Sequence, residues 1–141
     1  MDINRRNALL EKLQAKSIAV GQHPGPTVTI DDFFDGNDDL GSIGCNLISH
    51  PGVDKFYKSF ADIRSRSDVQ DVRVEIKDLV DEHSWPFADT VFVLTSMTQD
   101  NLRELVAALE PDEVGPFPSD SIPRDFPPLK AGMRVLGIWW D

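Results

Sequence analysis

The stretch DDFFDGNDDLGSIGCN holds five aspartates, three glycines and the only cysteine of the chain. Oxygen ligands at the first, third and fifth positions of a turn suit Ca²⁺, and Asp35, Asn37 and Asp39 have this spacing. However, Leu40 stands where such a loop needs glycine, and Asn46 stands where it needs a bidentate glutamate. The pattern favours a polar loop that bonds its own backbone. We expect no metal site and no cofactor.

The same stretch raises the question of a nucleophile, because a cysteine thiolate needs a nearby base or a helix N-terminus. Cys45 lies five residues before His50. However, Cys45 alternates with Ile43 and Leu47, which is typical of a small core residue. The three histidines have no metal-ligand spacing, and no phosphate-binding loop, dinucleotide motif or nucleophile elbow is present. We therefore expect no catalytic residue.

The charge of the chain is unevenly distributed. Its formal net charge is −10, and residues 17–54 contain no lysine or arginine. Nucleic-acid binding needs a basic surface, so that function is excluded, whereas an acidic surface can attract a basic protein. The leading hypothesis is a non-catalytic protein-interaction module that binds a basic partner, as toxin-neutralising immunity proteins do by analogy of type. Its predicted binding residues are Asp31, Asp32, Asp35, Asp38, Asp39 and an exposed Trp85 anchor.

Two other hypotheses about the function remain open. One is an enzyme or ligand-binding domain for a small molecule or divalent cation, with a pocket formed by the 31–46 loop and the proline-rich segment. Asp38, Asp39, Asn46 and His50 would be its polar groups. The other is a homodimer that forms through the C-terminal strand, without a small ligand.

The hydrophobic pattern indicates which elements position these residues. The expected elements are helices over 2–16, 51–66 and the residues after a Ser96–Gln99 capping box, one helical turn at TIDDFF capped by Thr29, and strands over 40–48, 69–77, 89–96 and 134–140. From residue 40 onward this order is βαββαβ. The predicted fold is therefore α+β, a ferredoxin-like antiparallel sheet over 40–141 in the strand order 4-1-3-2, with an additional N-terminal helix.

A connection over 111–132 contains six prolines and exceeds what a minimal ferredoxin-like unit needs. Its residues Phe117, Ile122, Phe126 and Leu129 predict that it is held against the surface. We expect one domain over 1–141, in which 1–39 form the N-terminal helix and acidic loop and 40–141 the core.

The localisation that the sequence predicts is cytoplasmic. No run of about 18 apolar residues is present, which excludes a membrane-spanning helix. The N-terminal residues lack the long apolar region of a signal peptide. A single cysteine fits a reducing compartment, since it cannot form an internal disulfide.

Five segments together resemble a family of small uncharacterised bacterial proteins: GNDDLGSIGCNL, HPGVDKFYKSF, WPFADTVFVLTS, LEPDEVG and the terminal GIWWD. They span residues 36–141 and leave the N-terminal helix outside the resemblance. The resemblance implies a bacterial protein of unknown function. It brings no activity, cofactor or site residue to this chain.

Overall fold

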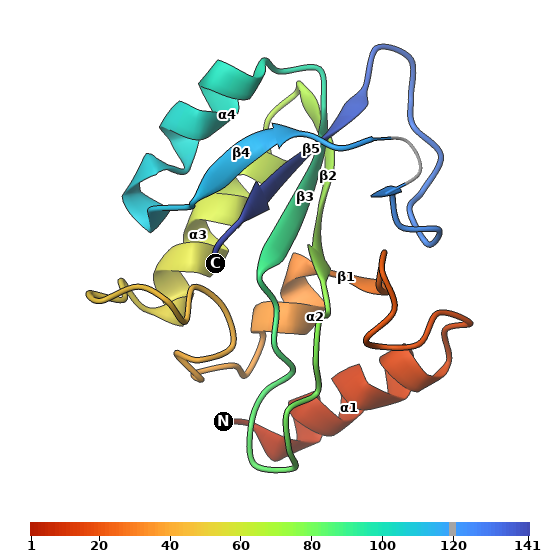
Figure 1. Ribbon diagram of the computed structural model, residues 1–141, viewed down its shortest axis with the longest axis vertical. Helices are drawn as coiled ribbons and strands as arrows, with labels where there is room; N and C mark the ends of the chain where they lie inside the picture. Colours follow the sequence, from red (N-terminus) through yellow and green to blue (C-terminus); the bar gives the residue numbers. More distant parts are fainter. Residues whose placement is uncertain (119–120) are drawn as a thin grey trace.

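The computed structural model describes residues 1–118 and 121–141. Short helices and strands follow one another and build an antiparallel sheet with helices beside it (Figure 1). The helices are α1 (Ile3–Gln14), α2 (Ile30–Phe34), α3 (Val53–Arg64), α4 (Gln99–Leu105) and the 3₁₀ turn η1 (Ala107–Leu109). The strands are β1 (Thr27–Thr29), β2 (Val69–Glu75), β3 (Thr90–Thr95), β4 (Glu113–Pro116) and β5 (Arg134–Trp139). No helix in these described residues is long and apolar enough to cross a membrane.

The elements with a clear hydrophobic period are confirmed. In α3, Val53, Phe56, Phe60 and Ile63 are buried along one stripe, as their helical spacing predicts. The strands predicted over 69–77, 89–96 and 134–140 correspond to β2, β3 and β5. The expected turn at TIDDFF is α2, and the hydroxyl of its N-cap Thr29 accepts the N–H of Asp32 at 3.1 Å.

The predicted Ser96–Gln99 capping box is wrong, and the cap of the first helix was not predicted. The N-cap of α4 is Thr98, two residues after the predicted Ser96, and its hydroxyl accepts the N–H of Asn101. The N-cap of α1 is Asp2, whose carboxylate accepts the N–H of Arg5. Both residues are N-cap types whose side-chain oxygen satisfies a free N–H of the first turn.

The strand order is β1-β2-β3-β5-β4, and every neighbouring pair is antiparallel. β3 is interior and buried on both faces, as its sequence predicts. The order differs from the ferredoxin-like order 4-1-3-2, in which the second predicted strand would be an edge. Instead β2 pairs with β3 on one side and with the short β1 on the other.

The strand predicted over 40–48 is wrong, because these residues form turns. Gly44 has a φ of +64°, which glycine adopts readily and which no regular strand contains. A Cβ at Gly44 would lie 2.7 Å from the Phe56 ring, so the loop backbone rests directly on α3. Ile43 is fully buried, whereas Cys45 is exposed. The alternation in the sequence therefore reflects a loop that buries Ile43, together with its neighbours Ser42 and Gly44, and not a strand.

Sequence reasoning also missed β4, which lies inside the proline-rich segment. This strand pairs with β5 along Glu113–Pro116. Consequently β5 has a strand neighbour on both sides, and its edge position in the predicted order 4-1-3-2 is wrong. The homodimer through the C-terminal strand stays a prediction. The backbone edge that remains on this side of the sheet belongs to β4.

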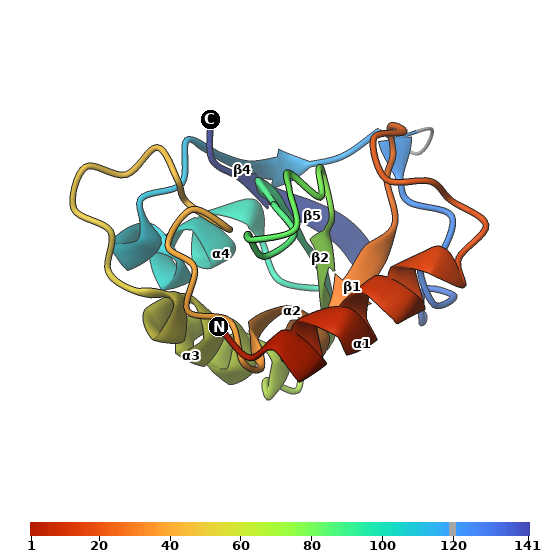
Figure 2. The same ribbon diagram turned by 90° about the horizontal axis from the view of Figure 1, so that it is seen from below.

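One face of the sheet packs against α2, α3 and α4 (Figure 2). Its hydrophobic cluster extends from Leu9 of α1 to Trp140. The Trp140 ring lies 5.4 Å from the Phe56 ring, between centroids, and its Nε1–H donates to the Leu109 carbonyl at 2.8 Å. The N-terminal helix thus buries its leucines in this cluster, at the edge where α2 and β1 lie.

The opposite face is covered by the segment after β4. Phe117 and Phe126 contact Phe92 of β3, with ring centroids 4.9 and 5.2 Å from it. Ile122 packs into the same cluster, whereas Leu129 is exposed, so the predicted attachment is confirmed for three of its four apolar residues. The Phe117 ring also lies over the bare backbone of Gly137 in β5.

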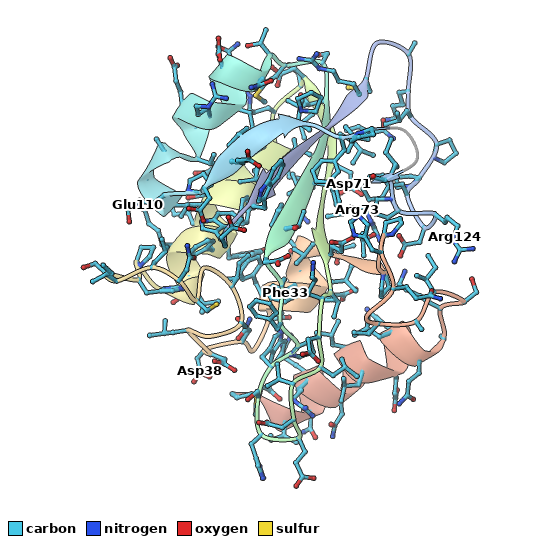
Figure 3. The ribbon with its side chains drawn as sticks, viewed as in Figure 1. Phe33, Asp38, Asp71, Arg73, Glu110 and Arg124 are labelled. Atoms are coloured by element: carbon cyan, nitrogen blue, oxygen red, sulfur yellow. The ribbon has the colours of Figure 1, made fainter. Side chains whose placement is uncertain are left out.

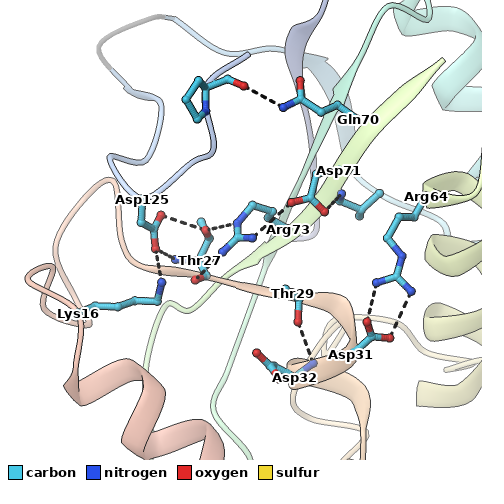
Figure 4. A network of polar contacts seen from close by, with 12 residues as sticks. Lys16, Thr27, Thr29, Asp31, Asp32, Arg64, Gln70, Asp71, Arg73 and Asp125 are labelled. Atoms are coloured by element: carbon cyan, nitrogen blue, oxygen red, sulfur yellow. Dashed lines mark hydrogen bonds and ion pairs between the residues drawn. The ribbon is translucent and has the colours of Figure 1, made fainter. Parts of the chain in front are cut away.

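Polar contacts fix the same segment to the first two strands (Figure 4). Asp125 accepts the backbone N–H of Thr27 at 2.8 Å and its hydroxyl at 3.0 Å, and it pairs with Lys16 at 3.0 Å. Arg73 of β2 donates to the same threonine hydroxyl at 2.8 Å. Because β1 has only three residues, these contacts provide much of what holds it at the edge of the sheet.

The contact of Phe117 with Gly137 leads to a testable prediction. A Cβ at residue 137 would overlap the Phe117 ring, so Gly137→Ala should lower the free energy of unfolding by about 1–3 kcal/mol. Gly115 faces Gly137 across the strand pair, and a Cβ there would lie 3.9 Å from Gln99. Gly115→Ala is therefore the control, and its free energy of unfolding should fall much less than that of Gly137→Ala. Equal losses in urea denaturation would contradict the overlap.

Glu75, at the end of β2, is a buried carboxylate with 4% of its surface exposed. Its strand neighbours are Thr27 and Thr90, and it accepts the N–H of Gly25 at 3.0 Å. Burial raises the pKa of Glu75 above its ordinary value, because the charged form loses its hydration; the Gly25 N–H opposes this in part. The folded state therefore binds this proton more tightly than the unfolded chain does.

This raised pKa predicts a dependence of stability on pH. The favourable contribution of protonated Glu75 is present below the ordinary glutamate pKa and is lost as the pH rises through the higher pKa of the folded state. Glu75→Gln should therefore be more stable than the wild type at neutral pH, and the difference should shrink toward acidic pH. Thermal melts over this range measure it, with the exposed Glu104→Gln as control. A constant difference would contradict the assigned cause.

Candidate functional site

A hollow of about 500 Å³ lies between α2, the loop that follows it and the first turns of α3. Four aspartates and two aromatic rings contribute to its wall, and no lysine or arginine does. The lining residues are Asp31, Phe34, Asp35, Gly36, Asn37, Asp38, Asp54 and Tyr57. The structure thus brings together Asp31, Asp35 and Asp38 of the predicted partner-binding set.

Asp31 is held by residues of α3. Its carboxylate accepts from both terminal nitrogens of Arg64, at 2.7 and 3.3 Å, and from the Tyr57 hydroxyl at 2.8 Å. The Arg64 guanidinium and the Tyr57 hydroxyl lower the pKa of Asp31 below its ordinary value, because both stabilise the ionised form. The same hydrogen bond raises the pKa of Tyr57. Asp31 is therefore ionised at neutral pH, and its charge is paired with the guanidinium of Arg64.

The other predicted aspartates of α2 and its following turn also have internal cations. Asp35 pairs with Arg5, and Asp32 pairs with Lys12 at 2.7 Å. Asp38 pairs with the amino group of Met1 at 2.9 Å, and this contact lowers its pKa. Asp38 nevertheless remains 75% exposed and projects from the loop in Figure 3. Asp32 lies outside the acidic hollow, in a groove beside β1.

Asp39 bonds to the backbone of its own loop and to a second loop. One carboxylate oxygen accepts the N–H of Gly41 at 2.9 Å, and the other accepts the N–H of Trp85 at 3.0 Å. The neighbouring Asn37 is 5% exposed, and its side chain bonds Asp39, Ser42 and Phe33 within the same turn. These contacts fit the prediction of a polar loop that bonds its own backbone.

The four residues of the alternative ligand site bind different partners. Asp38 lines the acidic hollow, whereas Asp39 bonds the two loops described above. Asn46 donates to Asp112 at 3.0 Å, which is a contact with the proline-rich segment. The Nδ1 atom of His50 accepts the N–H of Gly52, so Nε2 carries the ring proton and donates to the Ile43 carbonyl at 2.7 Å. Both ring nitrogens therefore hold the backbone before α3.

The exposed anchor expected at Trp85 is wrong, because its side chain is 1% exposed and belongs to the main hydrophobic cluster. The 78–87 loop folds over it and is tied to α1 by Arg6, which donates to the carbonyls of Ser84 and Asp81 at 2.7 and 2.8 Å. The indole Nε1 has no hydrogen-bond partner among the described residues. Trp85 thus contributes to packing beneath the hairpin.

Sequence reasoning missed both aromatic rings and the fourth carboxylate of the hollow. Phe34, Asp54 and Tyr57 line it, and the last two are three residues apart on α3. Residues at this spacing are neighbours on a helix surface, which is the signal that could have identified the pair. Tyr57 also falls next to the apolar stripe of α3, and its ring packs partly against the core.

The hollow combines negative charge with aromatic surface. The rings of Phe34 and Tyr57 are 5.8 Å apart and lie beside the carboxylates. Carboxylates attract an ammonium or guanidinium group, and an aromatic face attracts the same group through its π-electrons. Among the residues described, no group of three or more His, Cys, Asp or Glu side chains is arranged to hold a metal ion. The chemistry of the hollow therefore fits an organic cation.

These features define a small α+β protein with an acidic, aromatic-lined hollow. The chain belongs to the Uncharacterized protein YfbO family, whose model matches residues 4–138 and so includes the N-terminal helix that the resemblance had left outside. It is 33% identical to the Uncharacterized protein YfbO of Escherichia coli (strain K12) over 119 residues, which cover 84% of each chain. No solved structure matches the chain.

Two adjacent aspartates offer a matched test of the loop. Asp39→Asn should lower the free energy of unfolding by about 1–2 kcal/mol, because the amide has only one oxygen to replace two acceptors. Asp38→Asn should change stability by about 0.5 kcal/mol or less, since its pair with Met1 is on the surface. Urea denaturation of both variants measures the difference. Similar losses would contradict the structural role of Asp39.

Proposed function

We propose that this chain is a protein-interaction module whose acidic hollow accepts a lysine or arginine side chain of a basic partner. The observation that carries the proposal is the lining of the hollow, where four carboxylates and two aromatic rings meet without a basic residue in the wall. The net charge of −10 would draw such a partner toward the surface over a long range.

Asp54 and Asp38 supply the charge that the partner would meet. Asp54 forms no ion pair within the described part of the chain, and its side chain is exposed beside Tyr57. The pair of Asp38 with Met1 is a surface pair, and such pairs contribute about 0–1 kcal/mol, so a partner cation can replace the amino group at little cost. Tyr57 and Phe34 then provide the face against which the alkyl chain of the partner residue packs.

The bonds of Asp31 support the same chemistry. Its carboxylate already binds a guanidinium with two oxygens, in the geometry that makes arginine–carboxylate pairs specific. Arg64 therefore provides an internal example of the group that the hollow would bind. A small acidic protein that neutralises a basic toxin is one form that such a module takes.

The test is affinity capture from a bacterial lysate, with bound proteins eluted by a salt gradient. We expect a basic protein in stoichiometric amount, because ionic contacts weaken as salt screens them. With Asp38→Asn/Asp54→Asn, the same protein should elute at lower salt, and titration calorimetry with the purified partner should show a loss of affinity of about tenfold or more.

The control for this test is Asp62→Asn/Glu104→Gln, which removes the same charge at two exposed positions outside the hollow. It should leave the elution position close to that of the wild type. An equal shift with both double variants would assign the binding to overall charge and contradict a specific role of the hollow. Capture of no basic protein would also contradict the proposal.

A further inference from the structure

A second surface lies at the opposite side of the sheet, where β4 forms its edge. β4 pairs with β5 alone, so the other side of this strand has no strand neighbour within the described residues. A sheet edge exposes backbone N–H and C=O groups that can pair with another strand. Which groups of β4 point outward follows from the hydrogen bonds of β5.

The N–H of Trp140 donates to the carbonyl of Asp89, before β3, at 3.0 Å. Backbone groups of successive strand residues point to opposite sides, so Trp139 and Gly137 direct theirs toward β4. Their partners in β4 are Glu113 and Gly115. The N–H and C=O of Val114, between these two, therefore both point away from the sheet.

The outward groups of Val114 are incompletely satisfied. Its carbonyl accepts from the Arg103 side chain at 3.3 Å, which is a long contact. Beyond the β4–β5 pair, no described group accepts its N–H, and the residue as a whole is 6% exposed. A backbone N–H at a sheet edge is free to pair with an added strand, which would bond it together with the carbonyl.

A groove of about 540 Å³ follows this edge, between β4 and the α4–η1 helices. Its charged side chains are Glu110, Asp112 and Glu113 against the single Arg103, and Arg103 is itself paired with Asp100. Figure 3 places Glu110 on this side of the molecule, far from Arg124 on the proline-rich segment. The groove is thus large enough for a peptide backbone, and its side chains carry a net negative charge.

We propose that β4 is a docking site for an extended, lysine- or arginine-bearing segment of a partner, which adds to the sheet as a sixth strand. Val114 supplies one donor and one acceptor to this strand, and the three acidic side chains attract its basic residues. A second copy of this chain fits poorly, because self-pairing at Val114 would bring two such acidic groups together. This inference concerns a different surface from the acidic hollow and does not depend on it.

The test uses a short capped peptide of alternating valine and lysine, titrated against the ¹⁵N-labelled chain. The amides of Val114 and Gly115 should shift, and the Val114 N–H should become protected from hydrogen exchange. Val114→Pro removes this N–H without breaking an internal bond of the described structure and should weaken binding by about tenfold. Val114→Ala also loses the valine side chain but keeps the N–H, so it is the matched control. It should bind the peptide far more tightly than Val114→Pro does.

A second variant tests the charge without changing the backbone. Glu110→Gln/Glu113→Gln alters two exposed side chains and should weaken binding of the valine–lysine peptide, while a valine–glutamate peptide should not bind the wild type. Equal affinity of the proline and alanine variants would overturn strand addition. The proposed occupant would be overturned by tight binding of the glutamate peptide or by no binding of the lysine peptide. It would also be overturned if the Val114 amide signal shifted with protein concentration alone, without peptide.

Discussion

A sheet with apolar residues on both faces needs a cover on each, and in this chain the second cover depends on the contact of Phe117 with Gly137. The absence of a side chain at residue 137 lets the ring lie against the backbone of β5. This contact fixes where the proline-rich segment begins its path across Phe92. Asp125 can then reach Thr27, and β1 is held at the far edge of the sheet.

The helices and long strands could be predicted because the spacing of their apolar residues shows which side of each element is buried. The stripe of α3 and the alternation of β2 each extend over several residues and agree with a single structure. The 40–48 segment also alternates, but Gly44 adopts a turn conformation that side-chain patterning does not reveal. β4 is four residues long and contains a glycine and a proline, so its only strong signal is its partner, β5.

The sequence was enough to predict which acidic residues form the candidate site. It was not enough to predict which cations these residues pair with. The run of aspartates is visible in the sequence, and three of them line one hollow. Their cations come from distant positions: Arg64 reaches Asp31 across 33 residues, and Lys12 reaches Asp32 across 20. Only the tertiary fold determines such pairs. Asp38 and Asp39, which are adjacent and chemically identical, therefore acquire opposite roles, one exposed and one structural.

The position of β5 between β3 and β4 has a consequence for synthesis. A nascent chain that has delivered residues up to 116 contains β1, β2 and β3 in neighbouring positions, but β4 has no strand to pair with until residues 134–139 emerge. The pairing of β4 with β5 and the cover of the second face are therefore late, non-local events, and contacts of this kind slow folding. Until then the apolar outer face of β3 lacks its cover, and exposed apolar surface of this kind is prone to aggregation during folding.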